Sequence, residues 1–285
     1  MDLKTQFDYY INLINDFLTA RFSKDEGNEK LLSAMKYSTF AGGKRIRPAL
    51  MLAFSEAFGL DLHKVVPFAA ALELIHASSL VHDDLPALDN DDLRRGRPSN
   101  HKVFGEAFAV IAGDALMNLA YEICFENCKT ESEIKACRYL ANSAGYAGML
   151  GGQAYDIENE FAEPDEKTLL LIDNLKTAKL LSAPVVMAAV LADKDEQKAS
   201  VLGEKLGLLF QFTDDLLDVT GDEKLGKTLG KDEKEGKLTA VTVYGIATLK
   251  EKIDALKSEC VKIARELTDN EFVEFLIAAI AERKK

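Results

Sequence analysis

The chain has 285 residues, of which 47 % are hydrophobic and 29 % are charged, as is usual for a soluble globular protein. Its formal net charge of −12 argues against a broad surface for nucleic acid or anionic membrane, because such partners select a basic face. Anionic ligands would instead need local groups of basic residues.

The four cysteines, at positions 124, 128, 137 and 260, show no CxxC spacing. Cys124 and Cys128 are one helical turn apart, which predicts two small buried side chains rather than a zinc site. The first residues include acids and no long apolar core, so no signal peptide is expected. The longest apolar stretches, such as residues 181–192, are shorter than a bilayer span. We therefore expect a cytoplasmic protein without stable membrane insertion.

Apolar residues recur every three or four positions almost throughout the chain, which predicts amphipathic helices. The first stripe consists of Phe7, Ile11, Ile14 and Leu18. Prolines 48 and 67 stand where helices can begin, and proline 184 predicts a kink. After the first stripe, helices are expected over residues 28–40, 48–58, 69–81, 103–127, 131–148, 167–191, 197–219, 238–256 and 258–281.

Strand-type alternation is nearly absent, and no repeat or long linker divides the chain. The clearest loop is residues 221–236, where glycines alternate with charged residues. We therefore predict an all-α fold in a single domain over residues 1–285. Its form would be a bundle of about ten or more helices around a central cavity.

A dense acidic cluster, which includes Asp83, Asp84 and Asp89, follows the helix expected over residues 69–81. Carboxylates this close repel one another unless water or cations hold them. In a straight helix Asp83 and Asp89 would point to different sides. They can converge only if the helix loosens or ends between them, and Pro86 lies where this can happen. The alternative is a solvated acidic helix end.

A second acidic cluster places Asp214 and Asp218 one turn apart on one helix face, with Asp215 adjacent. Apolar residues flank this cluster and indicate a largely buried helix, where carboxylates need partners. The two clusters could face each other across a bundle cavity. Oxygen ligands beside a phosphate are the ligands that Mg²⁺ prefers.

Three groups of basic residues could hold phosphate. The first follows Gly42-Gly43 at the start of a helix, where backbone N–H groups and the helix dipole favour an anion. A solvated basic turn is the alternative for this group. His76, seven residues before Asp83, lies on nearly the same helix face and fits a diphosphate donor. The groups are Lys44, Arg45 and Arg47; Arg94 and Arg95; and Lys227, Lys231 and Lys237.

Several motifs together resemble one protein family over essentially the whole chain. They are GGKRIRP at 42–48, LELIHASSLVHDDLPALDNDDLRRG at 72–96, AGDAL at 112–116, GGQAYD at 151–156, LKTAKL at 175–180 and FQFTDDLLDV at 210–219, followed by GKTLGKD and EGKLTA. The sequence resembles the short-chain all-trans prenyl diphosphate synthases of the bacterial farnesyl diphosphate synthase (geranyltranstransferase) type. The paired aspartate motifs with the arginine doublet make this resemblance highly specific.

The resemblance implies an isoprenoid synthase-like fold, a homodimer and about three Mg²⁺ ions per active site. It implies head-to-tail condensation of isopentenyl diphosphate with dimethylallyl or geranyl diphosphate, through an allylic carbocation, to farnesyl or geranylgeranyl diphosphate. The implied metal ligands are Asp83, Asp84, Asp89, Asp214, Asp215 and Asp218. Arg94, Lys176, Lys227 and Lys237 would hold the allylic diphosphate; Lys44, Arg47, His76 and Arg95 would hold isopentenyl diphosphate; Thr177 and Gln211 would turn oxygen atoms toward the reacting carbons.

Two positions depart from the family pattern. After Lys237 the family often continues Thr-Tyr-Pro, whereas this chain reads Leu-Thr-Ala. Farnesyl synthases of the family often carry an aromatic residue on the floor of the product pocket, at or next to the position of Ser78. Small Ser78 and Ser79 favour twenty carbons over fifteen, unless a bulky residue such as Met117 or Met35 restores the floor. Helical projection places Ser79 near the Asp83 face and Ser78 further round, which leaves open which one meets the product.

Three other readings compete with a synthase. A terpene cyclase would use a similar aspartate-rich pocket but would not need the Lys44, Arg47 and His76 group. A non-catalytic partner subunit of a prenyltransferase could dispense with the aspartate motifs, and this chain keeps both. An acidic metal-buffer protein would leave the basic groups unexplained.

Overall fold

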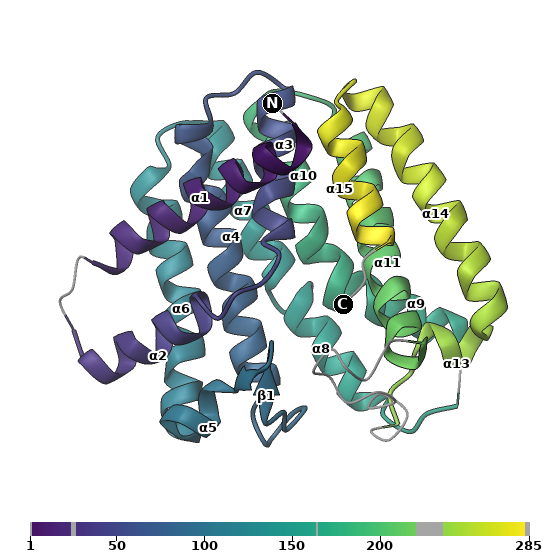
Figure 1. The fold of residues 1–285 in the computed structure, drawn as a ribbon, viewed down its shortest axis with the longest axis horizontal. Helices are drawn as coiled ribbons and strands as arrows, with labels where there is room; N and C mark the ends of the chain where they lie inside the picture. Colours follow the sequence, from purple (N-terminus) through teal and green to yellow (C-terminus); the bar gives the residue numbers. More distant parts are fainter. Residues whose placement is uncertain (1, 24–26, 164, 221–235, 283–285) are drawn as a thin grey trace. The chain divides into compact units, whose positions relative to one another are not determined.

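A computed structural model of the chain describes residues 2–23, 27–163, 165–220 and 236–282 (Figure 1). These residues are helical almost throughout, which confirms the all-α prediction. The chain forms two compact units, unit 1 (Met1–Leu52 and Asp61–Thr130) and unit 2 (Ala53–Leu60 and Glu131–Lys285). The arrangement in a single domain around one cavity stays a prediction.

Unit 1 is built around α4, which packs along α6, while α1 lies across α4 and α2 packs on α6 (Figure 1). Helix α4 is apolar on all sides, and fifteen of its residues are buried, as expected for a helix at the centre of a core. The elements of the unit are α1 (Leu3–Phe22), α2 (Glu29–Thr39), the first part of α3 (Ile46–Ala57), α4 (Leu62–Asp83), β1 (Leu93–Arg94), β2 (Arg97–Pro98), α5 (Asn100–Phe104) and α6 (Glu106–Asn127).

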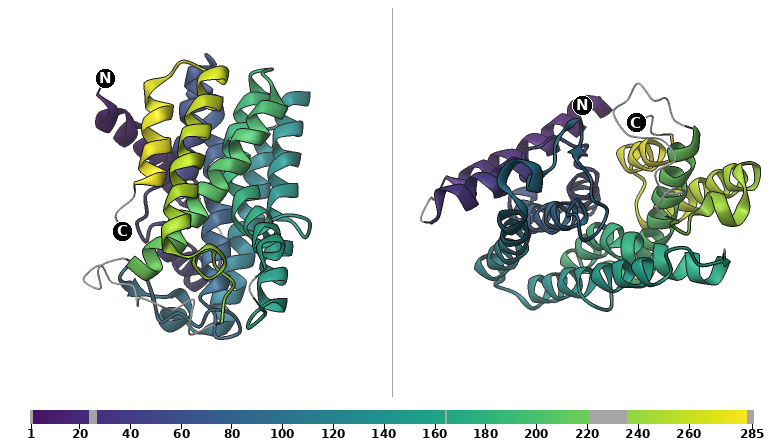
Figure 2. Two further views of the ribbon diagram at one scale, coloured as in Figure 1. Left: turned by 90° about the vertical axis from the view of Figure 1, so that its right-hand side faces the viewer. Right: turned by 90° about the horizontal axis from the view of Figure 1, so that it is seen from below.

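Unit 2 centres on α10, which packs between α7 and α11, and α14 and α15 lie side by side against α11 (Figure 2). A short π-helix, η1, connects α9 to α10 and contacts α8 and α11. The elements are α7 (Glu131–Ala144), α8 (Met149–Glu158), α9 (Glu166–Ile172), η1 (Asp173–Ala178), α10 (Lys179–Leu191), α11 (Glu196–Thr220), α13 (Ala240–Tyr244), α14 (Ile246–Leu267) and α15 (Glu271–Ala281).

Glycines in the left-handed region divide two helices that the sequence predicts as continuous. The helix expected over residues 103–127 is interrupted at Gly105 (φ +89°), and that expected over 238–256 is interrupted at Gly245 (φ +75°). The predicted break near residue 257 is wrong, because α14 continues to Leu267 and the chain turns only before Asn270, which caps α15.

The position of Pro67 also differs from prediction, because this proline lies inside α4 rather than at its start. Helix α4 begins five residues before Pro67, where the Asp61 side chain accepts a hydrogen bond from the His63 N–H at 3.0 Å. Pro184 lies inside α10, and the irregular backbone of this region is η1, upstream of that proline. Helix α8 covers the GGQAYD motif, for which the periodicity predicts no helix.

Three described helical stretches are long and apolar enough to cross a membrane by length and composition, namely Leu62–Asp83, Glu106–Asn127 and Glu166–Leu191. The prediction that the apolar stretches are too short is therefore wrong, because these helices continue past the charged residues that interrupt each run. In the most apolar 18 residues of each stretch, 78 % of the first stretch and 72 % of the third are buried. In α6 only 39 % of the corresponding residues are buried, so apolar surface is exposed on that helix.

Candidate active site

The first acidic cluster lies where α4 ends. The helix stops at Asp83, and the chain then turns so that the Asp89 N–H donates to the Asp83 carbonyl at 2.9 Å. A second turn bond joins the Asn90 N–H to the Leu85 carbonyl at 3.0 Å. The helix thus ends between Asp83 and Asp89, which is the condition that their convergence requires. Both side chains are partly exposed and offer carboxylate oxygens to a cation and its waters.

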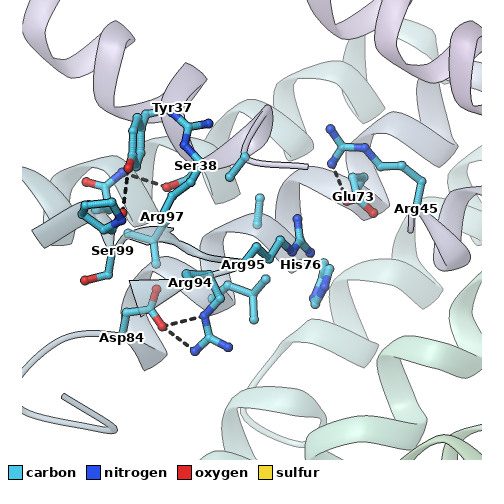
Figure 3. Close-up of a pocket in the computed structure, with 16 residues that line it drawn as sticks. Tyr37, Ser38, Arg45, Glu73, His76, Asp84, Arg94, Arg95, Arg97 and Ser99 are labelled. Atoms are coloured by element: carbon cyan, nitrogen blue, oxygen red, sulfur yellow. Dashed lines mark hydrogen bonds and ion pairs between the residues drawn. The ribbon is translucent and has the colours of Figure 1, made fainter. Parts of the chain in front are cut away.

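The middle aspartate of this cluster is engaged with an arginine. Asp84 is 2 % exposed and accepts hydrogen bonds from Arg94 Nε at 2.8 Å and from Arg94 Nη2 (Figure 3). Arg94 Nη2 also donates to Asp91 Oδ2 at 3.1 Å. Burial raises the pKa of Asp84 above its ordinary value, and the bonds from Arg94 only partly oppose this. Arg94 is thereby held in one orientation at the edge of the cluster.

A two-residue hairpin positions Arg95. Strands β1 and β2 pair antiparallel with Arg94 opposite Arg97, and Arg95 (φ +55°) and Gly96 (φ +75°) form the turn. The Arg95 guanidinium lies over Gly43 and donates to the Gly42 carbonyl. A Cβ added at Gly43 would stand 2.3 Å from Arg95 Nη1, so glycine is required for this approach. Two basic groups that are distant in sequence therefore meet in unit 1.

The turn that carries the first basic group directs one of its cations inward. Arg45 has φ +49° and is 6 % exposed. Its Nη1 forms an ion pair with Glu73 Oε1 at 2.6 Å, and its Nη2 donates to the Thr39 carbonyl at 2.6 Å (Figure 3). Glu73 is itself 3 % exposed. Arg45 is thus a structural cation of unit 1, while the neighbouring Lys44 is exposed.

His76 is joined to Arg47 rather than to an acid. The distance between Arg47 Nη1 and His76 Nε2 is 3.2 Å. Burial and the positive charge of Arg47 hold the pKa of His76 well below its ordinary value, so the ring is neutral at neutral pH. Since the guanidinium can only donate, Nε2 is the acceptor and the ring proton lies on Nδ1. His76 therefore orients Arg47 and can itself donate one hydrogen bond.

A pocket in unit 1 brings several predicted residues together. Figure 3 shows Arg94 turned toward Asp84 and Arg45 turned toward Glu73, with Arg95 and His76 also on the lining. The pocket thus combines acidic and basic groups at the end of α4. The acidic, basic and histidine residues that line it are Arg45, Glu73, His76, Asp84, Arg94, Arg95 and Arg97.

The two serines above the acidic cluster have different surroundings. Ser78 is fully buried, and its Oγ makes no hydrogen bond to protein. Ser79 is partly exposed, and its Oγ donates to the His76 carbonyl at 2.9 Å. Ser78 therefore faces the core of unit 1 and Ser79 does not. Which of them meets the product stays a prediction.

In unit 2 the π-helix η1 carries Lys176 and Thr177. Lys176 Nζ donates to Asp156 Oδ2 at 2.5 Å, and Asp156 is 7 % exposed on α8. A Cβ added at Gly152 would stand 2.1 Å from the Lys176 backbone nitrogen, so this glycine lets α8 approach η1 closely. The sequence gives Asp156 no role. Gly152 and Asp156 are four residues apart in the GGQAYD motif, which places both on one helix face. This spacing is the signal from which a role for Asp156 could have been predicted.

A chain of hydrogen bonds links the second aspartate motif to Thr177. Thr177 Oγ1 donates to Gln211 Oε1 at 2.7 Å, and Gln211 Nε2 donates to Asp215 Oδ1 at 2.7 Å. The Ala240 N–H donates to Asp215 Oδ2 at 2.6 Å. Asp215 is buried at 3 % exposure. Asp214 and Asp218 are partly exposed on α11.

Asp173 is a buried acid that the sequence does not single out. It lies at the start of η1, is 5 % exposed, and its Oδ2 makes no hydrogen bond to protein. Burial, followed by the charges of Asp215 and Asp156, raises its pKa well above the ordinary value. An acid in such surroundings favours its protonated form.

The predicted residues are divided between the two units. Within the described residues, no group of three or more His, Cys, Asp or Glu side chains is close enough to hold a metal ion without other ligands. Lys227 and Lys231 lie outside the described residues. Unit 1 holds Lys44, Arg47, His76, Ser78, Ser79, Asp83, Asp84, Asp89, Arg94 and Arg95; unit 2 holds Lys176, Thr177, Gln211, Asp214, Asp215, Asp218 and Lys237.

Comparison with known proteins gives consistent matches over nearly the whole chain. A family model described as polyprenyl synthetase matches residues 28–279. A farnesyl diphosphate synthase of Micrococcus luteus is 39 % identical over 285 residues, which cover 97 % of this chain and 96 % of the relative. One of Geobacillus stearothermophilus is 44 % identical over 236 residues, which cover 80 % of each chain.

Two solved structures share the fold. A geranylgeranyl pyrophosphate synthetase of Pyrococcus horikoshii superposes with a TM-score of 0.89 at 26 % identity and covers 99 % of this chain and 98 % of its own. A geranyltransferase of Helicobacter pylori, complexed with magnesium and isoprenyl diphosphate, has a TM-score of 0.82 at 28 % identity and covers 96 % of each chain.

Proposed function

Because the chain belongs to the polyprenyl synthetase family and is a prenyltransferase, we propose that it condenses isopentenyl diphosphate head-to-tail with dimethylallyl or geranyl diphosphate. The observation that carries this proposal is the unit 1 pocket, where an acidic helix end meets the basic residues of two distant motifs. The product would be farnesyl or geranylgeranyl diphosphate.

The diphosphate of isopentenyl diphosphate would be held by Lys44, Arg47, His76 and Arg95. The contact of Arg95 with the Gly42-Gly43 turn supports this assignment, because it brings a guanidinium to the loop that carries Lys44. The contact of Arg47 with neutral His76 supports it as well, since the guanidinium keeps its full charge there. Several fixed donors around one anion favour diphosphate over singly charged ligands.

The allylic diphosphate would be held by Mg²⁺ together with basic side chains. Partly exposed Asp83, Asp89, Asp214 and Asp218 offer oxygen donors with access for water and phosphate, which suits this ion. When bound, Mg²⁺ would stabilise the negative charge that develops on the departing diphosphate. An expected three ions per site stays a prediction. Arg94, Lys176, Lys227 and Lys237 would complete the binding of this group.

Loss of diphosphate leaves an allylic cation that needs oriented oxygen atoms and no competing water. The Thr177 hydroxyl donates a hydrogen bond to Gln211 Oε1, so its lone pairs can point toward the cationic carbon. Attack by the double bond of isopentenyl diphosphate then forms the new carbon–carbon bond. The departed diphosphate is the base that takes the final proton.

The proposal is tested by incubating the purified chain with Mg²⁺, isopentenyl diphosphate and each allylic diphosphate in turn. We expect elongated prenyl diphosphates, and none when EDTA removes the metal. Products that form without isopentenyl diphosphate would indicate a terpene cyclase. A chain that forms no product with any primer would be a partner subunit, and this outcome would contradict the proposed activity.

The length of the product is a finer part of the proposal. Ser79→Tyr would place a ring on the partly exposed side of α4, whereas Ser78→Tyr would place one in the core. Chromatography of the products should show shortening in the variant whose side chain faces the growing chain. Unchanged length in both variants, with unfolding midpoints as in the wild type, would place the floor elsewhere, at residues such as Met117 or Met35.

We further propose a cytoplasmic homodimer. Helix α6 leaves Val110 42 %, Ile111 50 % and Phe125 77 % exposed, an apolar surface that a second copy can cover. Sedimentation equilibrium should give twice the chain mass, and Phe125→Glu should weaken the association. A monomer at micromolar concentration would contradict this part of the proposal.

A further inference from the structure

Asp215 lies at the centre of the hydrogen-bond chain of unit 2. Each of its two oxygens accepts a hydrogen bond, Oδ1 from the Gln211 amide and Oδ2 from the Ala240 N–H. Its 3 % exposure leaves little access for water or for the oxygen of a ligand. The acid directly before it, Asp214, is partly exposed on α11. Two neighbouring carboxylates therefore have different surroundings.

The bond from Gln211 to Asp215 decides which way the Gln211 amide points. A primary amide can present either its oxygen or its nitrogen in a given direction. Because Asp215 can only accept when ionised, Nε2 must face it, and Oε1 then faces Thr177. A reversed amide would place a donor against Thr177, and the hydroxyl would turn its proton elsewhere.

The other oxygen of Asp215 holds the start of α13. Ala240 is the first residue of that helix and follows Lys237 by three positions. A proline at position 240, as in the Thr-Tyr-Pro continuation of the family, has no N–H to donate. In this chain Asp215 thus ties the segment after Lys237 to the same helix that carries Gln211.

We propose that Asp215 is a positioning residue, which orients Gln211 and Thr177 and holds the start of α13, and that it is not a metal ligand. This inference rests on the proposed function, since it assigns Asp215 a part in the same reaction. Asp214 and Asp218 then remain as the metal ligands of the second motif.

The first experiment compares Asp215→Asn with Asp214→Asn. The asparagine at position 215 offers one acceptor and one donor group to two donors, so either one hydrogen bond is lost or the Gln211 amide reverses. We expect kcat to fall about 10- to 100-fold, while the Mg²⁺ concentration for half-maximal rate stays within about twofold of wild type. Asp214→Asn should raise that concentration about tenfold or more. A shift for Asp215→Asn as large as that for Asp214→Asn would overturn the proposal.

A binding measurement gives a readout that does not depend on turnover. Mn²⁺ binding is followed by EPR with the S-thiolo analogue of geranyl diphosphate, which does not ionise readily. Asp215→Asn should bind as many Mn²⁺ ions as wild type with similar affinity. One fewer ion in this variant would show that Asp215 is a metal ligand.

The second experiment exchanges the amide and the carboxylate between positions 211 and 215, so that the hydrogen bonds between them are restored. In the pair Gln211→Glu and Asp215→Asn, the new amide at 215 donates to the new carboxylate at 211. The amide oxygen still accepts from Ala240, and the second oxygen at 211 still accepts from Thr177. We expect the pair to have a kcat at least about tenfold above the worse single variant. A pair no better than the worse single variant would overturn the proposal.

A third comparison covers the case in which Asp215→Asn does not fold. Ala240→Pro removes the N–H at a first helical position, where proline is tolerated, and Ala240→Gly keeps it. We expect Ala240→Pro alone to lower kcat about threefold or more, with an unchanged Mg²⁺ requirement. Equal kcat values in both variants would contradict a role for the hydrogen bond between the Ala240 N–H and Asp215.

Failure of the proposed function can be told apart from failure of this inference. If wild type forms no product, the proposed activity fails, but the double-mutant cycle between positions 211 and 215 can still be measured as free energy of unfolding. Favourable coupling in the exchanged pair would support the positioning role, and additive changes would contradict it.

Discussion

Several charged side chains of unit 1 are buried against one another. Arg45 and Glu73 are both less than a tenth exposed, and Arg94 joins Asp84, which is 2 % exposed. Each of these residues has its charge balanced by a close partner. A substitution that removes one partner therefore leaves a buried charge behind, with a cost larger than the net contribution of the pair.

We predict that Glu73→Gln lowers the free energy of unfolding by about 3–5 kcal/mol, because the Arg45 guanidinium then lies buried without its counter-charge. Urea unfolding at neutral pH measures this change. The matched control is Glu274→Gln, which breaks the exposed pair with Arg265 and should cost far less. Equal losses in the two variants would contradict a structural role for the buried pair.

The neutral ring of His76 predicts a pH dependence of stability. The pKa of His76 is lowered in the folded chain, whereas an unfolded histidine titrates near about 6.5. Its contribution is therefore fully present above pH 6.5 and is lost as the pH falls below that value toward the folded pKa. Between pH 7.5 and 5.5, wild type should lose more unfolding free energy than His76→Gln. Parallel losses in the two proteins would refute a lowered pKa.

The roles of neighbouring cations are the part of the site that sequence cannot assign. Arg45 and Arg47 are two positions apart in one basic turn, yet Arg45 pairs with Glu73 and Arg47 with His76. The left-handed backbone at Arg45, which charge patterns do not encode, accompanies the inward direction of its side chain. The choice between Asp84 and Asp83 as the partner of Arg94 depends likewise on where α4 ends.

At the scale of helices, glycines determine how closely two elements approach. Gly113 on α6 faces the His82 ring, whose Nε2 lies 3.1 Å from the Val110 carbonyl, while Gly152 on α8 faces the backbone of Lys176. A ring can turn aside to accept a methyl group, but a helix backbone cannot. The two glycines therefore differ in what a substitution would require.

We predict that Gly113→Ala destabilises the chain less than Gly152→Ala does, because the His82 ring can turn aside, and that adding His82→Ala removes any loss that the ring causes. Gly152→Ala should destabilise by about 1–3 kcal/mol, because its obstacle is the backbone of η1. Thermal unfolding of the single and double variants provides the measurement. A Gly152→Ala protein as stable as wild type would contradict the close approach of α8 and η1.

Periodicity predicts most helices well, because their apolar stripes are long. It fails at Gly105 and Gly245, where a single residue with a positive φ turns the chain between two consecutive helices. It also cannot predict η1, since the local sequence of a π-helix resembles that of an α-helix. The hairpin at Arg95-Gly96 escapes prediction because each strand has only two residues.

At the scale of the whole molecule, the chain crosses between its two units inside a helix. Helix α3 runs from Ile46 to Ala57, and the boundary between unit 1 and unit 2 falls after Leu52. A continuous helix cannot be half folded without losing hydrogen bonds at the break. The stability of one unit is therefore tied to that of the other.

This arrangement predicts one cooperative unfolding transition for the full chain. Circular dichroism and tyrosine fluorescence should give the same midpoint in urea. A fragment of residues 131–285 should be less structured than unit 2 is in the full chain, because it lacks residues 53–60. Two separate transitions, or a fully folded fragment, would show that the units are independent.

The place of residues 53–60 also has a consequence for biosynthesis. This segment is synthesised within the first quarter of the chain, but the rest of its unit begins only at Glu131. Phe54 is fully buried in the folded protein, but more than seventy further residues must be synthesised before the rest of its unit begins to appear. During that interval the nascent chain exposes an apolar segment that a chaperone could hold.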